Sequence, residues 1–139
     1  MFVPGPTGWS DLNAAIARIP TYRAGIARWV VGDTGGSWWG TADWYDGVIY
    51  INPSTPLVRL YDVAVHEWSH MLTVHDYGGN VDLTITALSH AFEGAGILGA
   101  ERAADCMALI QGAQWVHYTW CDNSAWRAMA HRLLHGDQV

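Results

Sequence analysis

The chain has 139 residues, of which half are apolar and 14% are charged, and its formal net charge at pH 7 is −6. This length accommodates one hydrophobic core, so we expect a single domain spanning residues 1–139. The negative balance argues against a nucleic-acid partner, because neutralising phosphates requires clustered Lys or Arg. No apolar run reaches the roughly 18 to 20 residues of a membrane helix, so no membrane partner is expected.

The first residues do not resemble a secretory signal. Met1 to Thr7 contain no basic residue followed by an apolar stretch. We therefore expect a protein that is made in the cytosol without a signal peptide, or a mature domain cut from a longer chain.

The first half of the chain predicts one helix and three short strands. Ser10 is expected to cap a helix that ends before Pro20. Asp46-Gly47 is a hairpin signal between two later strands. The β-branched and aromatic stretches that predict the strands are residues 26–31, 38–44 and 48–51.

The second half predicts helices. Apolar residues recur at helical spacing from Leu57 to Leu72, so a helix is expected to begin with Pro56 as its first residue and to end by Gly78. Further helices are expected over residues 81–92, 100–111 and 124–134, with glycines 94, 96 and 99 breaking the chain between the first two. This order indicates a small α+β domain with a short, mostly antiparallel three-stranded sheet.

The most specific chemical signal is the motif His66-Glu67-Trp68-Ser69-His70. Histidines four residues apart on a helix lie one turn apart on the same face, so both imidazoles can reach one metal ion. Glu67 lies beside the first histidine, where it can accept a proton from water without binding the metal itself. The other residues from 63 to 72 are uncharged, which is typical of a buried metal-binding helix.

A catalytic zinc site has three protein ligands and one open position, so a third ligand is needed. Glu101, on the strongly helical segment 100–111, is the first candidate. Asp105 lies one turn later on the same face and is expected to orient a ligand histidine through a hydrogen bond.

Asp76 is the alternative third ligand. Its distance from His70 matches the HExxHxxGxxD pattern of small snapalysin-like metzincin proteases. However, Thr73 occupies the glycine position of that pattern, and a threonine does not easily adopt the left-handed turn that brings the chain back to the metal.

The HExxH motif followed by Glu101-Arg102-Ala103-Ala104-Asp105 resembles the HExxH…ExxAD pattern of gluzincin metallopeptidases, above all the single-domain minigluzincins. The resemblance covers residues 48–112. It implies a small zincin-like fold, a Zn²⁺ ion on His66, His70 and Glu101, and peptide-bond hydrolysis with Glu67 as the base. It also implies that the strand before the active-site helix is an edge strand that pairs with an extended substrate peptide.

The small size, the Arg-only basic set and the nine tryptophans are also similar to the N-terminal peptidase domains of actinobacteriophage lysins. This narrower resemblance implies a phage endolysin that cuts the stem peptides of peptidoglycan. It also implies action at the cell wall or outside the cell.

His117 and Tyr118 follow the Glu101 helix in an aromatic segment and are candidate catalytic donors to the oxyanion of the reaction. Packing in the core or on the surface is an equally good interpretation of both. Trp38, Trp39 and Trp44 are candidates for a substrate groove beside Tyr50, although core packing is expected for at least two of the three. Cys106 and Cys121 either form a disulfide that closes a short loop or are two buried thiols.

Two other functions remain open. The chain could be a regulatory protease with one protein target, or a zinc-binding module without hydrolysis. Glu67 argues against the module, because a purely structural metal site has no use for a base at that position. The lack of a basic, DNA-reading motif argues against a fused regulator.

Overall fold

The computed structural model describes residues 5–139, and these residues form five helices and three strands. The helices are α1 (Ser10–Ala17), α2 (Leu57–Asp76), α3 (Val81–Ala91), α4 (Leu98–Ile110) and α5 (Ser124–Leu134). The strands are β1 (Arg28–Val31), β2 (Gly40–Asp43) and β3 (Val48–Ile51). The predicted α+β class is confirmed. The N-terminal stretch 1–7, in which no signal peptide is expected, lies partly outside the described residues.

β3 occupies the centre of the sheet, between β1 and β2. It pairs in parallel with β1 and antiparallel with β2, so the sheet is mixed rather than mostly antiparallel. The expectation that β3 is an edge strand is wrong, because the connection 32–39 carries the chain across to the other side of β3 before β2 begins. The predicted hairpin turn between β2 and β3 is present, and Gly47 in it has a φ of 69°.

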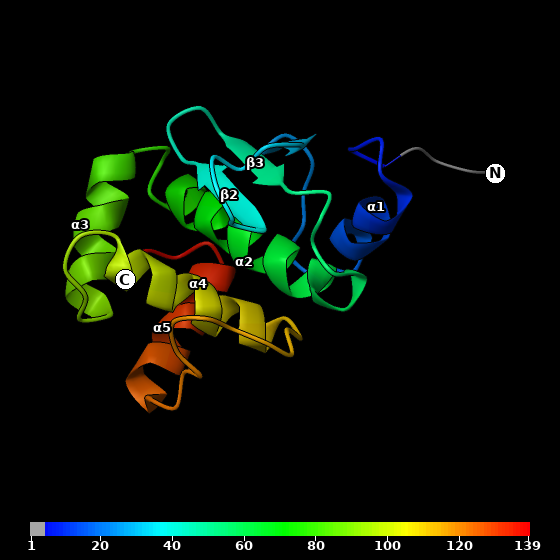
Figure 1. Cartoon of the computed structure of the whole chain (residues 1–139). Coiled ribbons are helices and arrows are strands. Elements are labelled where there is room, and N and C mark those ends of the chain that lie inside the picture. The colour runs from blue at the N-terminus through cyan, green and yellow to red at the C-terminus, as the bar shows by residue number, and fades with distance from the viewer. Residues whose placement is uncertain (1–4) are drawn as a thin grey trace.

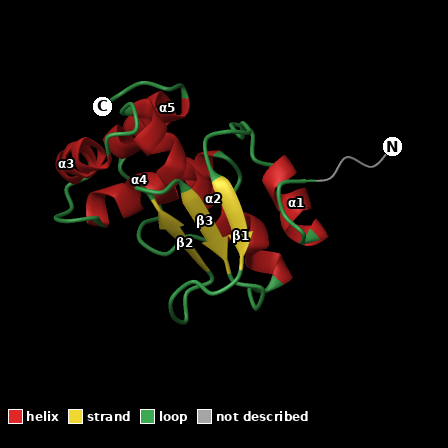
Figure 2. Ribbon diagram, turned by 90° about the horizontal axis from the view of Figure 1, so that it is seen from above, coloured by secondary structure: helices red, strands yellow, loops and turns green. Residues whose placement is uncertain are grey.

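α2 runs through the middle of the molecule, with the sheet on one side and α4 and α5 on the other (Figure 1). Figure 2 shows the three strands lying against α2, with β3 between its two neighbours. Fourteen of the 20 residues of α2 are buried. A polar side chain that is buried without a partner destabilises the fold, so the buried polar residues of the HExxH motif need partners within the protein or a bound ligand.

Two helices begin one residue away from the predicted positions. Trp9, and not Ser10, is the N-cap of α1, and it makes no side-chain capping bond. Pro56 is the N-cap of α2 rather than its first helical residue. α2 ends as predicted before Gly78, which has a φ of 69° and therefore a left-handed conformation that favours glycine.

Gly99 lies inside the first turn of α4 and is not a helix breaker. A Cβ atom at this position would lie 2.3 Å from the carbonyl oxygen of Leu88 on α3. Because glycine has no side chain, the backbone of α4 can lie directly against the backbone of α3 at this point. Gly99 lies two residues before Glu101, so this contact positions the first turn of α4 and the glutamate in it.

Cys106 and Cys121 form a disulfide, which settles the alternative that the sequence leaves open. The bond joins the middle of α4 to the segment that precedes α5. α5 begins as predicted at Ser124, with the Asn123 side chain accepting a hydrogen bond from the N–H of Trp126 (3.1 Å). Within residues 5–139, none of the helices combines the length and the apolar character that crossing a bilayer requires.

Candidate metal centre

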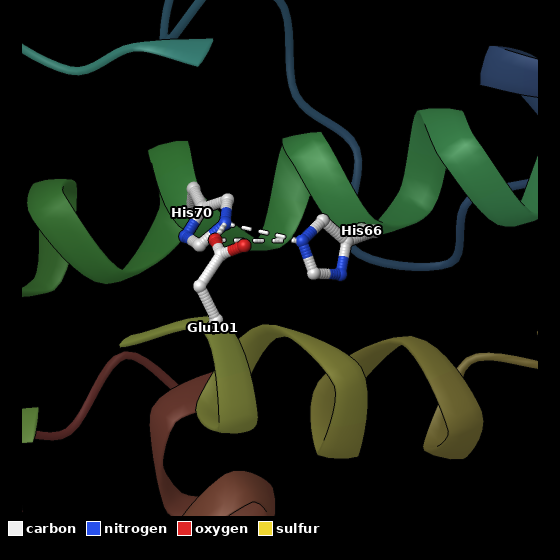
Figure 3. Close-up of side chains that lie close together, drawn as sticks. All are labelled: His66, His70 and Glu101. Atoms are coloured by element: carbon white, nitrogen blue, oxygen red, sulfur yellow. Dashed lines mark hydrogen bonds and ion pairs between the residues drawn. The ribbon is translucent and has the colours of Figure 1, made fainter. Parts of the chain in front are cut away.

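Three side chains from two helices meet at one point: His66 and His70 from α2, and Glu101 from α4. Figure 3 shows the carboxylate of Glu101 reaching up from α4 toward both imidazoles. The two Nε2 atoms are 3.2 Å apart, and the Nε2 atom of His66 is 3.7 Å from Oε1 of Glu101. The same carboxylate oxygen contacts Nε2 of His70.

This arrangement fits a metal ion. Ligand atoms about 2.1 Å from a tetrahedral metal lie roughly 3.4 Å from one another. The ligand atoms of His66, His70 and Glu101 all lie within 4.8 Å of one another, and the group is largely buried. Two imidazole nitrogens and one carboxylate oxygen could therefore hold a metal ion with little rearrangement.

Asp105 orients the first histidine. Its Oδ1 atom lies 2.7 Å from Nδ1 of His66, as predicted from the helical spacing of Glu101 and Asp105. If Nδ1 carries the proton and donates it to Asp105, the lone pair of Nε2 faces the metal position. The other oxygen, Oδ2, accepts hydrogen bonds from the backbone N–H groups of Tyr118 (2.5 Å) and Thr119 (3.1 Å). Asp105 thus fixes both a candidate ligand and the segment that follows α4.

The carboxylates around the two imidazoles favour a positive charge at this position. Burial lowers the pKa of His66, but hydrogen bonds to Asp105 and Glu101 outweigh it and raise this pKa to about 10. Burial raises the pKa of Glu101, but the His70 and His66 imidazoles outweigh it and hold that pKa well below its ordinary value. The same electrostatic field favours a bound cation.

Glu67 lies beside this group but does not belong to it. The side chain is buried and lines the same cleft as the three candidate ligands. Burial raises the pKa of its carboxyl, which brings it nearer to the range of a general base at neutral pH. Among residues 5–139 no hydrogen bond to the Glu67 carboxylate is found, so the carboxylate remains available to a substrate or a water molecule.

The site lies in a cleft of about 510 Å³ between β2 on one side and α4 with its following segment on the other. Trp38, Trp39 and Trp44 line this cleft, as the groove hypothesis predicts, and Trp39 and Trp44 also pack against the core, as expected for two of the three. Tyr50 is not among the residues that line it. The strand beside the cleft is β2, whose residues Thr41 and Ala42 are among the lining residues.

His117 and Tyr118 also line the cleft. The Tyr118 ring is stacked on the His66 ring with their centroids 6.0 Å apart. Burial and the nearby Glu101 carboxylate raise the pKa of Tyr118 above 10, so its hydroxyl keeps its proton and can donate it in a hydrogen bond. The centroid of the His117 ring lies 4.8 Å from that of the Tyr118 ring, which it meets edge-on, and 6.0 Å from that of the Trp115 ring.

Asp76 lies away from the metal group. α2 continues without interruption through Thr73 to Asp76, six residues beyond His70. Six residues of helix span about 9 Å, so the Asp76 carboxylate does not join the two histidines. Thr73 is buried inside this uninterrupted helix, and its hydroxyl donates to the carbonyl of His70 (2.8 Å).

Asp62 is a cleft residue that sequence reasoning missed. Its Oδ1 atom accepts a hydrogen bond from the N–H of Gln114 (2.8 Å), and its Oδ2 atom lies 3.3 Å from the Arg59 guanidinium. Asp62 and Asp105 therefore hold the segment 114–119 from two helices. The signal was present, because Asp62 lies one helical turn before His66.

Gly40, the first residue of β2, is a second residue that was missed. A Cβ atom there would lie 2.6 Å from Cγ1 of Val63 and 3.1 Å from Cγ of Glu67. Glycine thus allows β2 to approach α2 closely beside the candidate base. No local signal marks this position, because the contact joins segments far apart in the sequence.

No family model, curated protein or solved structure matches this chain.

Proposed function

We propose that this protein is a zinc-dependent peptide-bond hydrolase. One observation carries the proposal: His66, His70 and Glu101 converge in a cleft, with the unengaged carboxylate of Glu67 next to them. Two histidines and one glutamate form a donor set that catalytic zinc sites of peptidases use, and this set leaves the fourth position open. Imidazole with carboxylate suits zinc better than calcium or magnesium, which prefer oxygen ligands.

A zinc ion held by these residues would supply Lewis-acid chemistry, because it lowers the pKa of coordinated water and polarises a carbonyl group. Glu67 accepts the proton of the attacking water and delivers it to the leaving amine. Asp105 keeps the His66 ring in the orientation that presents Nε2. Tyr118 donates its hydroxyl proton in a hydrogen bond to the oxygen that develops negative charge.

The substrate is an extended peptide that lies along the cleft. β2 is an edge strand, so one row of its backbone N–H and C=O groups is free to pair with another strand. Thr41 and Ala42 bring this edge to the cleft wall. The resemblance to phage lysin domains makes peptidoglycan stem peptides the first substrate to test, with action at the cell wall.

The first experiment measures metal content by mass spectrometry after purification without added metal. We expect about one zinc per wild-type chain, strong loss of zinc in Glu101→Ala and wild-type content in the matched variant Asp76→Ala. The reverse ranking of these two variants would favour the metzincin-like ligand set. An absence of metal in all three proteins would overturn the proposal.

The second experiment separates hydrolysis from metal binding. Glu67→Gln is expected to keep its zinc but to lose at least about 10²-fold in turnover, because the proton acceptor is gone. Purified peptidoglycan and a panel of unfolded proteins serve as substrates. If the Glu67→Gln protein retained its turnover, Glu67 would be excluded as the base. Bound zinc without hydrolysis of any substrate by the wild type would favour the non-catalytic module.

A further inference from the structure

Aromatic side chains stand at both ends of the cleft. Trp39 and Trp44 flank β2 directly, and both line the cleft. At one end the Trp39 ring packs against the Trp115 ring, with centroids 5.8 Å apart. At the other end the Trp44 ring lies 4.8 Å from the His70 ring. The metal group is therefore flanked by apolar surface in both directions along β2.

The wall opposite β2 continues this aromatic surface. Four rings follow one another along this wall, in the order Trp115, His117, Tyr118 and His66. The distances between successive ring centroids are 6.0, 4.8 and 6.0 Å. Ile97, which is exposed and precedes α4, lies on the same side of the cleft as Glu101. Large apolar side chains of a bound peptide would thus find flat or aliphatic surface at each end.

The charges in the cleft leave no anchor for a chain terminus. Neither Arg nor Lys is among the described residues that line it, so an α-carboxylate has no guanidinium or ammonium group to bind. Asp62 is occupied by Arg59 and by the N–H of Gln114. Asp105 and Glu101 are occupied by the imidazoles. Only the proposed base Glu67 remains, and a substrate amine that paired with it would block the reaction.

We infer that the cleft accepts an internal segment of a polypeptide with a large apolar side chain on each side of the bond to be cut. The protein would therefore be an endopeptidase for apolar sequences rather than an enzyme that trims chain ends. This inference rests on the proposed hydrolase function and narrows its substrate. Stem peptides, whose residues are mostly small or charged, are on this inference expected to bind more weakly than apolar peptides, and they serve as the contrasting substrate class in the test.

The chain offers a matched pair of tryptophans to test this. Trp38 lines the cleft and is 57% exposed, whereas Trp120 is 59% exposed and lies outside the cleft lining. Because both rings are largely in solvent, replacing either by Ala leaves the fold intact. Trp115→Ala serves as a second cleft variant, with its fold checked by circular dichroism.

Binding is measured with the zinc-loaded Glu67→Gln protein, so that peptides are not consumed. The probe is an octapeptide with acetyl and amide ends and Phe or Leu at its two central positions. We expect Trp38→Ala and Trp115→Ala, each added to this background, to weaken binding about tenfold, and Trp120→Ala to leave it unchanged. Replacing the central residues by Ala or Asp is expected to weaken binding by a similar factor, and unblocking the termini to bring no gain.

Equal binding by the Trp38→Ala and Trp120→Ala proteins, or tighter binding of peptides with free termini, would overturn the inference. Preferred binding of stem peptides over the apolar peptide would overturn it as well. Turnover of the blocked peptide by the wild-type protein is then measured separately. If the peptides bind in the expected order but the wild-type protein hydrolyses none of them, the cleft binds apolar peptides as inferred and the proposed hydrolase function is refuted.

Discussion

The carboxylate of Asp105 lies 2.7 Å from Nδ1 of His66 with one oxygen and holds two backbone N–H groups with the other. Asp105→Asn would place an amide N–H₂ against donors on one side or the other. We therefore expect zinc affinity to fall by about 10- to 100-fold, as measured by competition with a chromophoric chelator. Asp46→Asn, in the exposed hairpin turn, is the control, and an equal loss there would refute the orienting role.

Tyr118 lies closer to the candidate ligands than His117 does, because its ring stacks on His66 while His117 contacts Trp115 and Tyr118. Tyr118→Phe is expected to lower kcat by about 10²-fold and to leave zinc content unchanged, because one donor to the developing oxyanion is lost. His117→Gln should have a smaller effect. Steady-state kinetics on the best substrate tests this order, and a larger effect of His117→Gln would assign the donor to the histidine.

Gly40 sets the distance between β2 and α2. The added methyl group of Gly40→Ala would collide with Val63 and press on Glu67, so β2 must move away from the helix. We expect a loss of about 1 to 3 kcal/mol in the free energy of unfolding together with reduced turnover. Gly8→Ala is the matched control, because a Cβ atom at Gly8 meets nothing within 4 Å. Urea denaturation of both variants gives the comparison, and equal stabilities would contradict the close packing.

The disulfide between Cys106 and Cys121 closes a segment that carries His117 and Tyr118. Removing it with Ser at both positions is expected to cost about 3 kcal/mol in the free energy of unfolding, since the unfolded chain gains loop entropy. Chemical reduction of the wild type should reproduce the same shift in the urea midpoint. A double variant as stable as the oxidised wild type would show that the bond adds nothing to the fold.

Asp76 gives the stability a pH dependence that is separate from the metal group. One of its oxygens is buried without a hydrogen-bond partner among the described residues. Burial raises the pKa of Asp76 from 3.8 to about 7 in the folded protein. The folded state therefore binds the proton more tightly than the unfolded state, and stability falls as pH rises from about 4 to about 7.

Asp76→Asn removes this dependence. Relative to the wild type, the variant should gain stability on the order of 1 kcal/mol between pH 5 and pH 8, after allowance for solvent screening. Titration of the metal ligands is common to both proteins and cancels in the difference. Urea midpoints of the two proteins at both pH values provide the measurement, and a constant difference would show that Asp76 has an ordinary pKa.

Local signals predicted much of the fold. β3 and α5 begin and end where turn residues and caps place them, since Asn52 and Asn123 act within a few residues along the chain. The grouping of His66 and His70 follows from helix geometry alone. Glu101 was a candidate from its place on the next strongly helical segment and from the resemblance to a known motif, and its contact with His70 agrees with both.

The features that were missed are contacts between distant segments. The position of β3 at the centre of the sheet depends on how β1 and β2 pair, and short strands with similar composition do not encode their order. Gly99 was taken as a helix breaker and Gly40 received no role beyond its place in the predicted strand 38–44, although each permits a close approach to another element. Composition near a glycine does not distinguish these roles.

The packing of Gly99 on Leu88 has a consequence for how such sites can diverge. This contact docks α4 on α3, so the position of Glu101 opposite the histidines depends on α3, which lies between His70 and Glu101 in the sequence. Insertions or deletions among proteins that share this architecture are therefore expected in the loops 77–80 and 92–97 on either side of α3, and not in α3 itself. A small residue two positions before the glutamate is not free to change. A sequence signature for this kind of centre should fix that Gly-x-Glu step together with a preceding helix, and leave the lengths of the two loops beside that helix open.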